Sequence, residues 1–383
     1  MERQSTSHTS VLRVLHLSAG NLYGGVETML ATLAGLRHLC ADMEPHFALC
    51  FEGRLSRELR EAGVPVYMLG AVRISRPWTV WRARRRLQAL LREGAFDAVV
   101  CHMAWPLVVF GKAARKAGQK IVFWSHGFPT KQNWLERMAG RTAPDLSISN
   151  SRFTAAAVAN LFPGVPASVV YCPVPLAEAP DRDQWRTAIR KELGIGEETT
   201  VIIQVSRMQA WKGHLLHLKA LAQLEERDWL CWFAGGAQRP EEERYLTELQ
   251  QAAARLRVTE RVRFLGQRSD VPKLLAAADI FCQPNREPEP FGIAFIEALW
   301  AGRPVVTTAM GGALEVVDET CGILAAPDDA AGLAAALASL IRSPELRTRL
   351  GRAGTGRARQ LSDPATQMGA LRDSLAGLKR EKA

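Results

Sequence analysis

The sequence predicts an α/β protein made of two doubly wound parallel sheets, one after the other. Short apolar runs alternate with longer helical patterns along the chain, which is typical of parallel βα units. The 383 residues are too many for one ordinary core and suit two domains of about 150 to 200 residues. A proline-rich stretch, 171–180, separates two groups of apolar runs and marks the join between the domains.

Each apolar run is an expected strand, and the segments between the runs are expected helices and loops. In the first domain the expected strands are 11–17, 46–51, 66–69, 98–102, 120–124, 146–148 and 168–170. In the second domain they are 200–205, 229–234, 262–265, 280–283, 304–307 and 322–325. The pattern at 363–379 is helical, and we expect this segment to pack back on one of the domains. The expected boundaries are 1–175 for the first domain, 176–362 for the second and 363–383 for the final helix.

Composition indicates a globular protein with a preference for anionic partners. Hydrophobic residues make up 47% of the chain and charged residues 23%, which argues against disorder. The net charge is +10, so phosphorylated nucleotides, anionic lipids and nucleic acids all suit it. No apolar run reaches the roughly 18 to 20 residues that span a bilayer. The polar segment 1–10 lacks a secretory apolar region, so we expect a frayed tail and a cytoplasmic protein.

Seven cysteines are scattered without the paired spacing of a disulfide framework or of a zinc site. Cys50, Cys101, Cys231 and Cys282 lie in or beside apolar runs. We therefore expect buried thiols in a reducing compartment.

Much of the positive charge lies in one segment, 73–92, which also carries Trp78 and Trp81. Its arginines are Arg73, Arg76, Arg82, Arg84, Arg85, Arg86 and Arg92. The pattern predicts a basic amphipathic helix with aromatic residues at its start. It is compatible with an ordinary surface helix or with docking to an anionic membrane surface. Nucleic acid is disfavoured as a partner, because its binding requires a broad basic face with stacking aromatic residues, whereas the positive charge here is largely confined to one helix.

Two carboxylates, Glu289 and Glu297, flank a predicted helix start. Pro290 and Gly292 favour a loop that opens a helix, and Gly302 marks its end. This helix is apolar nearly all round, with Glu297 as its only charge, which indicates a buried element. An unpaired buried carboxylate is costly, so a hydroxyl-rich ligand or a cation is its natural complement. A structural pair with an arginine is the alternative.

Other polar groups follow predicted strands, where ligands of doubly wound sheets bind. Arg207 and Lys212 follow the strand 200–205 and suit a phosphate or diphosphate at a helix entrance. Gly24 and Gly25 form a glycine-rich turn after the first strand, although glycines also simply make turns. His126 follows the strand 120–124; this position favours a ligand contact, and a structural histidine is the alternative.

Together these motifs resemble the GT-B glycosyltransferases, and within them the retaining family 4 enzymes that use nucleotide sugars. The resemblance covers nearly all of the chain. Its motifs are Gly24-Gly25-Val26-Glu27, Ser125-His126-Gly127, Ser206-Arg207 with Lys212-Gly213, Phe264-Leu265-Gly266, Glu289-Pro290-Phe291-Gly292 with Glu297-Ala298, and Gly302-Arg303-Pro304-Val305-Val306 with Gly311-Gly312. It implies a first, acceptor-binding and a second, donor-binding Rossmann-like domain facing a cleft.

The resemblance also implies roles for single residues. Arg207 and Lys212 would hold the donor diphosphate, Glu297 would bind the ribose hydroxyls and Glu289 would contact the transferred sugar. The other implied contacts are the amides of Phe291, Gly292 and Ile293, Gly266 near the base, Gly24 and Gly25 at the diphosphate and acceptor, and His126 at the donor sugar. The catalytic group is then His126, Arg207, Lys212 and Glu289.

The implied reaction is a front-side transfer with retention, in which the leaving phosphate helps to deprotonate the acceptor hydroxyl. No protein nucleophile, metal or other cofactor is expected, because cations and helix ends replace the metal. Three positions depart from the family pattern: Glu287 is a second loop glutamate, Asn285 stands where small hydroxyl residues are frequent, and Trp211 adds bulk beside Lys212. Only Glu289 has seven residues between it and Glu297.

The expected function is therefore transfer of a hexose from a nucleoside diphosphate sugar to a sugar or lipid-linked acceptor. Envelope polysaccharide, lipopolysaccharide or glycolipid synthesis at the inner face of the membrane is the expected setting. Two alternatives remain open: a nucleotide-sugar epimerase of the same fold, and a non-catalytic binding scaffold. The donor's base and sugar and the acceptor stay open at this point.

Overall fold

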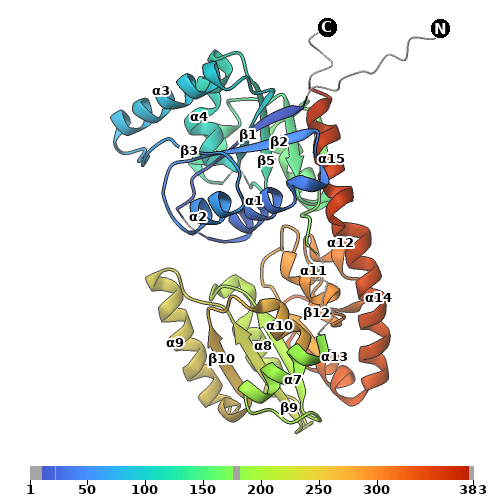
Figure 1. Cartoon of the computed structure of the whole chain (residues 1–383). Coiled ribbons are helices and arrows are strands. Elements are labelled where there is room, and N and C mark those ends of the chain that lie inside the picture. Colours follow the sequence, from blue (N-terminus) through green and yellow to red (C-terminus); the bar gives the residue numbers. More distant parts are fainter. Residues whose placement is uncertain (1–10, 22, 131, 176–181, 379–383) are drawn as a thin grey trace, which may run out of the picture. The chain divides into compact units, whose positions relative to one another are not determined.

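The chain forms two compact units in the computed structural model, which describes residues 11–21, 23–130, 132–175 and 182–378. Unit 1 comprises Met1–Pro175 and Asp363–Ala383, and unit 2 comprises Leu176–Ser362. In each unit, helices flank a parallel sheet (Figure 1). This confirms the predicted α/β class with two doubly wound sheets. The expected frayed tail at 1–10 and the second half of the proline-rich join lie outside the described residues.

Unit 1 holds a seven-stranded sheet in the order β3-β2-β1-β4-β5-β6-β7, with all neighbours parallel. The strands are β1 (Leu12–Ser18), β2 (Met43–Leu49), β3 (Val66–Met68), β4 (Ala98–His102), β5 (Lys120–Ser125), β6 (Leu146–Ser149) and β7 (Ala167–Val169). The helices are α1 (Gly25–Gly35), η1 (Arg37–Leu39), α2 (Arg54–Glu61), α3 (Pro77–Glu93), α4 (Ala104–Lys116), α5 (Trp134–Ala139), α6 (Arg152–Leu161) and α15 (Pro364–Ala376).

Unit 2 holds a six-stranded parallel sheet in the order β10-β9-β8-β11-β12-β13. The strands are β8 (Thr200–Val205), β9 (Trp229–Ala234), β10 (Val262–Gly266), β11 (Ile280–Gln283), β12 (Val305–Thr308) and β13 (Gly322–Ala325). The helices are α7 (Arg182–Glu192), η2 (Ala210–Lys212), α8 (His214–Leu221), α9 (Pro240–Arg255), η3 (Thr259–Arg261), α10 (Val271–Ala277), α11 (Ile293–Trp300), α12 (Ala313–Val316), α13 (Ala330–Arg342) and α14 (Pro344–Ser362).

The strand order reverses between β1 and β4 in unit 1 and between β8 and β11 in unit 2. At such a switch point the connections leave in opposite directions and open a crevice at the carboxyl ends of the strands. In unit 2 the loops that meet there carry Arg207 and Lys212 after β8, and Glu289 after β11.

All thirteen expected strands are present, with one notable shift. β2 was expected at 46–51 but runs from Met43 to Leu49, in register with the whole of β1. The start of β2 is not visible in the apolar pattern because Pro45 interrupts that pattern. Pro45 has no N–H to donate, but β3 pairs with β2 only from Phe47 onward, so no hydrogen bond between β2 and β3 is lost. The strand ends at Leu49 because the amides of Cys50 and Phe51 both donate to the carbonyl of Ala19.

The final helix, α15, packs within unit 1. Arg372 on α15 donates to Asp42 at 2.8 Å, and the buried Gln367 accepts from the backbone amide of Tyr171 at 3.0 Å. All seven cysteines are free and buried, as the pattern around four of them indicated. Burial raises the pKa of the Cys101 and Cys172 thiols to about 12, so these side chains act as small apolar residues.

Candidate functional site

A buried carboxylate binds Arg207, the first of the two cations in the loop after β8. Arg207 pairs with Glu242 in the first turn of α9, and Glu242 is 3% exposed. Glu242 also accepts from the side-chain amide of Gln209 at 3.0 Å and from the backbone amide of Gln238 at 2.7 Å. With these donors in place, the buried charge of Glu242 is compensated and the guanidinium of Arg207 is held in one direction.

Sequence reasoning missed Glu242. It lies in the run Glu241-Glu242-Glu243 behind Pro240, which looks like the ordinary acidic first turn of a helix. Helical spacing places only the middle one towards the β8 loop, and the sequence does not show which helix packs against that loop.

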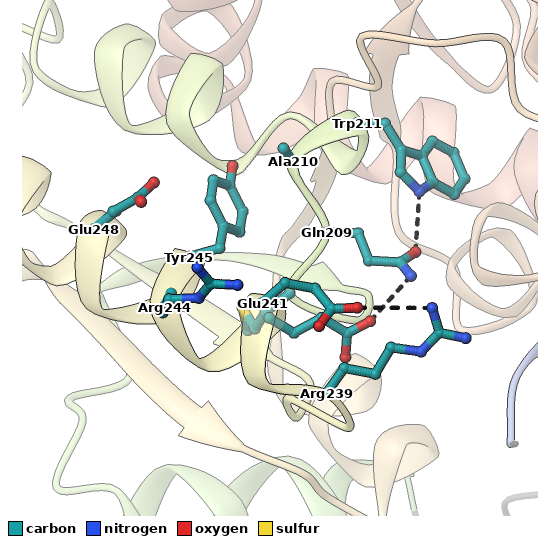
Figure 2. A pocket seen from close by; sticks show the side chains of 10 residues that line it. Gln209, Ala210, Trp211, Arg239, Glu241, Arg244, Tyr245 and Glu248 are labelled. Carbon is teal, nitrogen blue, oxygen red and sulfur yellow. Dashed lines mark hydrogen bonds and ion pairs between the residues drawn. The ribbon is translucent and has the colours of Figure 1, made fainter.

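A pocket with a volume of about 380 Å³ borders this loop (Figure 2). The side chain of Gln209, labelled in Figure 2, accepts from Trp211 Nε1 at 2.9 Å and donates to Glu242 at 3.0 Å. The other lining residues are Met208, Ala210, Arg239, Glu241, Arg244, Tyr245 and Glu248. Gln209 thereby connects the bulky Trp211 to the carboxylate that orients Arg207.

The second cation, Lys212, is bound by the loop after β11. Its Nζ donates to Glu289 Oε2 at 2.7 Å and lies 3.8 Å from the centre of the Trp211 ring. The backbone allows this approach because Gly213 has a φ of +76°, and a Cβ there would meet the carbonyl oxygen of Pro284 at 1.7 Å. The two loops of the switch point therefore pack directly against each other.

Glu289 is 8% exposed, whereas the neighbouring Glu287 is exposed to solvent. Glu289 accepts from Asn285 Nδ2 at 2.8 Å as well as from Lys212, which gives the unusual Asn285 a clear role. Its carbonyl accepts from the amide of Gly312 at 2.7 Å, and a Cβ on Gly312 would meet Pro290. The Gly311-Gly312 pair is thus required for the loop after β12 to lie against the Glu289 loop.

The side-chain carboxylate of Glu297, on α11, has no hydrogen bond or ion pair among the described residues. It is half-buried, and burial raises its pKa from 4.5 to about 7. The structural alternative, a pair with an arginine, is absent from the described residues. A carboxylate in this state can take hydroxyl donors from a ligand without first breaking a contact in the protein.

The glycines next to α11 and β10 adopt backbone conformations with positive φ that other residues rarely take. Gly292 precedes α11 with a φ of +101°, and a Cβ there would overlap the Phe295 ring. Its turn places Phe291, Gly292 and Ile293 at the amino end of α11, where helix amides favour an anion. Gly266 ends β10 with a φ of +65°, and its carbonyl accepts from the amide of Gly235 at 2.8 Å.

Three further candidate residues belong to unit 1. Gly24 caps α1 and donates its amide to Glu27 at 3.0 Å, while Gly25 opens the helix. A Cβ built on Gly25 meets nothing within 4 Å, so packing does not require that glycine and the backbone there is open to close approach. His126 follows β5, and its Nε2 lies 2.8 Å from His102 Nδ1.

Both halves of the chain match models of known families. The model described as glycosyl transferases group 1 matches residues 186–357, and the model described as glycosyltransferase family 4 matches residues 23–178. These matches cover the Arg207 and Glu289 loops in unit 2 and the Gly24 and His126 loops in unit 1.

Curated relatives and solved structures agree with these models. A GDP-mannose-dependent alpha-(1-6)-phosphatidylinositol monomannoside mannosyltransferase of Mycolicibacterium smegmatis is 31% identical over 291 residues, which are 70% of this chain and 73% of that protein. A D-inositol 3-phosphate glycosyltransferase of Corynebacterium glutamicum is 33% identical over 199 residues, 49% of this chain and 46% of that protein. The structure of Anabaena HepE in complex with UDP and glucose is 24% identical with a TM-score of 0.84, over 95% of this chain and 99% of that one.

Proposed function

Because the chain belongs to the group 1 glycosyl transferases of family 4, we propose that it moves a hexose from a nucleoside diphosphate to an acceptor hydroxyl with retention of configuration. The single observation that supports the donor site best is the set of groups at the unit 2 switch point. Two cations, each oriented by a carboxylate, lie on one loop, and an unpaired half-buried carboxylate lies on the helix after the neighbouring strand.

Each group has a chemical role in this proposal. Arg207 and Lys212 bind the diphosphate and stabilise the negative charge that develops when its bond to the anomeric carbon breaks. The amides at the start of α11 add partial positive charge to the same site. Glu297 accepts from the ribose hydroxyls, and Glu289 orients Lys212 and contacts the sugar. His126, Gly24 and Gly25 are the proposed contributions of unit 1, whose sheet is the proposed acceptor side.

The proposed reaction uses no divalent metal, since the charge of the leaving diphosphate is met by Arg207 and Lys212. The acceptor hydroxyl attacks the face from which the nucleotide leaves, and an oxygen of the leaving phosphate takes its proton. Glu289 and Glu297 bind the donor in this scheme, so they are not an acid and nucleophile pair of the glycosidase type.

GDP-mannose is the first donor to test, because the relative from M. smegmatis is named for that donor and aligns over most of this chain. UDP-glucose is the second, because HepE has been crystallised with UDP and glucose. We expect one of these nucleotides to raise the melting temperature of the protein selectively, by the same amount with and without EDTA. A shift that EDTA abolishes contradicts metal independence, and no shift with any nucleotide contradicts the donor site.

Transfer should also require an acceptor. A sugar released or converted from the donor at full rate without any acceptor favours the epimerase alternative, and donor binding without turnover favours the scaffold. The names of the mannosyltransferase relatives support a lipid-linked acceptor as the first one to test, in envelope glycolipid or polysaccharide synthesis.

We propose that the protein is cytoplasmic and attaches peripherally to an anionic membrane through α3. Among the described residues, no helix has the length and apolarity needed to cross a bilayer. Trp78 and Trp81 are exposed at 59% and 57% at the start of this helix, and Ile74 in the loop before it is exposed at 40%. Trp81 is covered on one face by the Arg85 guanidinium, 4.3 Å from the ring centre. Exposed tryptophans beside arginines suit the interface of an anionic lipid surface.

Not every arginine of this segment is available to a membrane. Arg84 donates to the carbonyl of Val109 at 2.6 Å, and Arg86 donates to the carbonyl of Leu69 at 3.1 Å, so both stabilise unit 1. The helix also begins at Pro77, so Arg73 and Arg76 lie in the loop before it. The charges that remain for lipid include those of Arg82 and Arg85, both exposed on α3.

We predict that replacing Trp78 and Trp81 by Ser, with Arg82→Gln and Arg85→Gln, reduces binding to vesicles of anionic phospholipid at least tenfold. Insertion of two tryptophan rings into the lipid interface, together with two positive charges near anionic headgroups, contributes several kcal/mol to the free energy of membrane binding. Co-sedimentation measures the affinity. Arg349→Gln with Arg352→Gln, two exposed arginines on α14, is the matched control. Equal vesicle binding by both variants would make α3 an ordinary surface helix.

A further inference from the structure

Three histidines form a continuous hydrogen-bonded row across neighbouring strands of unit 1. His16 lies in β1, His102 ends β4 and His126 follows β5. His16 Nδ1 is 2.9 Å from His102 Nε2, and His102 Nδ1 is 2.8 Å from His126 Nε2. These strands are adjacent in the sheet, so the row is a direct product of the fold.

Burial favours the neutral form of all three rings. Burial lowers the pKa of His16 and of His126 to about 3 and that of His102 well below its usual value. The rings pack on aromatic neighbours: His16 stacks on Phe47, and both His102 and His126 stack on Trp124. A neutral imidazole has one N–H and one lone pair, so each can donate at one end and accept at the other.

A row of such rings has only two complete proton arrangements. In one, every ring carries its proton on Nδ1; His16 then donates to His102, His102 donates to His126, and the Nδ1–H of His126 is left over. In the other, every proton is on Nε2; the bonds run the opposite way, and the Nε2–H of His16 is left over. One bond fixes the next, because a mixed arrangement places two protons or two lone pairs face to face.

The two ends of the row differ in their surroundings. His16 Nε2 is buried and has no hydrogen-bond partner among the described residues. His126 Nδ1 also has no partner there, but His126 is only half-buried and this nitrogen is not shut off from solvent. A buried N–H without an acceptor is rarer and costlier than an unused lone pair. The arrangement with all protons on Nδ1 avoids that cost.

We propose that His16 and His102 are positioning residues that hold His126 as the Nδ1–H tautomer, so that it donates a hydrogen bond to an oxygen of the transferred sugar. This inference rests on the proposed function. It assigns His126 as a donor and not as the base that takes the proton of the acceptor hydroxyl, because its outward nitrogen already carries a proton. The same bonds fix the plane and direction of the ring.

The tautomers can be read directly in the intact protein by nitrogen NMR after labelling with ¹⁵N-histidine, since protonated and unprotonated ring nitrogens differ widely in shift. His126→Asn and His16→Asn spectra assign the signals by the ones that disappear. We expect all three rings of the row to be neutral at pH 7 with protonated Nδ1. An Nε2-protonated or charged His126 would overturn the proposal.

A variant tests the consequence for the reaction. The Met side chain in His102→Met can accept a hydrogen bond but cannot donate one, so His126 is expected to move its proton to Nε2. We expect at least a tenfold weaker affinity for the nucleotide sugar, with the affinity for the free nucleoside diphosphate unchanged. The exposed His38→Gln variant is the control and should change neither affinity.

These outcomes separate the inference from the proposed function. Binding and turnover of the donor by the wild type test the function, whatever the tautomer. A His102→Met protein that keeps normal donor affinity, or that retains protonated Nδ1 on His126, removes the positioning role alone. If that variant does not fold, the wild-type spectrum still decides the tautomer.

Discussion

Lys212→Met is expected to lower the rate of sugar transfer by on the order of 10²- to 10³-fold. The leaving diphosphate loses a cation that acts where negative charge develops, and losses of single charge-stabilising donors have this size. The variant should also lose about 3 kcal/mol of stability, because the side chain of Glu289 is only 11% exposed and loses its cation. Steady-state kinetics and denaturant unfolding measure the two effects.

A second substitution separates chemistry from folding. Lys212→Met combined with Glu289→Gln removes the unpaired charge and keeps the hydrogen bond that Asn285 donates to this position. We expect it to regain most of the stability but none of the rate. Lys219→Met, an exposed lysine on α8, is the matched control. Near-normal turnover of Lys212→Met, or a rate that returns together with stability, would remove the diphosphate assignment.

Glu297→Gln is expected to stabilise the free protein while it weakens nucleotide binding. The folded pKa of about 7 lies above the usual 4.5, so the charged form is the one that folding disfavours. Below about pH 4.5 the group is neutral in both states and costs nothing. The penalty grows as the pH rises from 4.5 to 7 and levels off at about 3 kcal/mol above that. The variant should therefore be more stable at pH 8 and unchanged at pH 4.5.

The same residue should make nucleotide binding depend on pH. A hydrogen bond from a ribose hydroxyl to a carboxylate is worth about 1.5 to 3 kcal/mol, against about 0.5 to 1.5 kcal/mol for one to an amide or a protonated acid. Calorimetry of the wild type should show affinity falling as the pH drops below about 7, and Glu297→Gln should bind at least tenfold more weakly at pH 8 with little pH dependence. Exposed Glu319→Gln is the control. Unchanged affinity in Glu297→Gln would mean that this carboxylate serves another purpose.

Local patterns predicted the elements well because they depend on neighbours in the sequence. The predicted bounds of β4, β8, β9 and β11 agree with the structure at both ends. Helix α11 lies between Gly292 and Gly302, the two glycines that were predicted to flank it. β2 was misplaced because Pro45 interrupts its apolar pattern while pairing with β1 maintains the strand. Hydrogen bonds between distant segments decide such boundaries, and a single sequence does not record them.

Candidate site residues were found where their chemistry is unusual for their position. Glu297 was noticeable as the only charge on an apolar helix, and in the structure it has no partner among the described residues. Glu242 looked like one of three ordinary helix-start acids, although it is the one that binds Arg207. His16 and His102 looked like parts of strands, and their bonds to each other and to His126 exist only across the sheet.

The order of apolar runs, the glycine pairs and the spacing of Glu289 and Glu297 by themselves determined the fold class and the family. These features are local or periodic, and backbone geometry and hydrophobic burial translate them directly into βα units. Only the tertiary structure decided the partners of each charge: Glu289 for Lys212, Glu242 for Arg207, backbone carbonyls for Arg84 and Arg86, and none among the described residues for Glu297. The two glutamate pairings depend on which segments converge at the carboxyl ends of adjacent strands. Strand order there brings Lys212 to Glu289, 77 residues away in the sequence, and Arg207 to Glu242, 35 residues away.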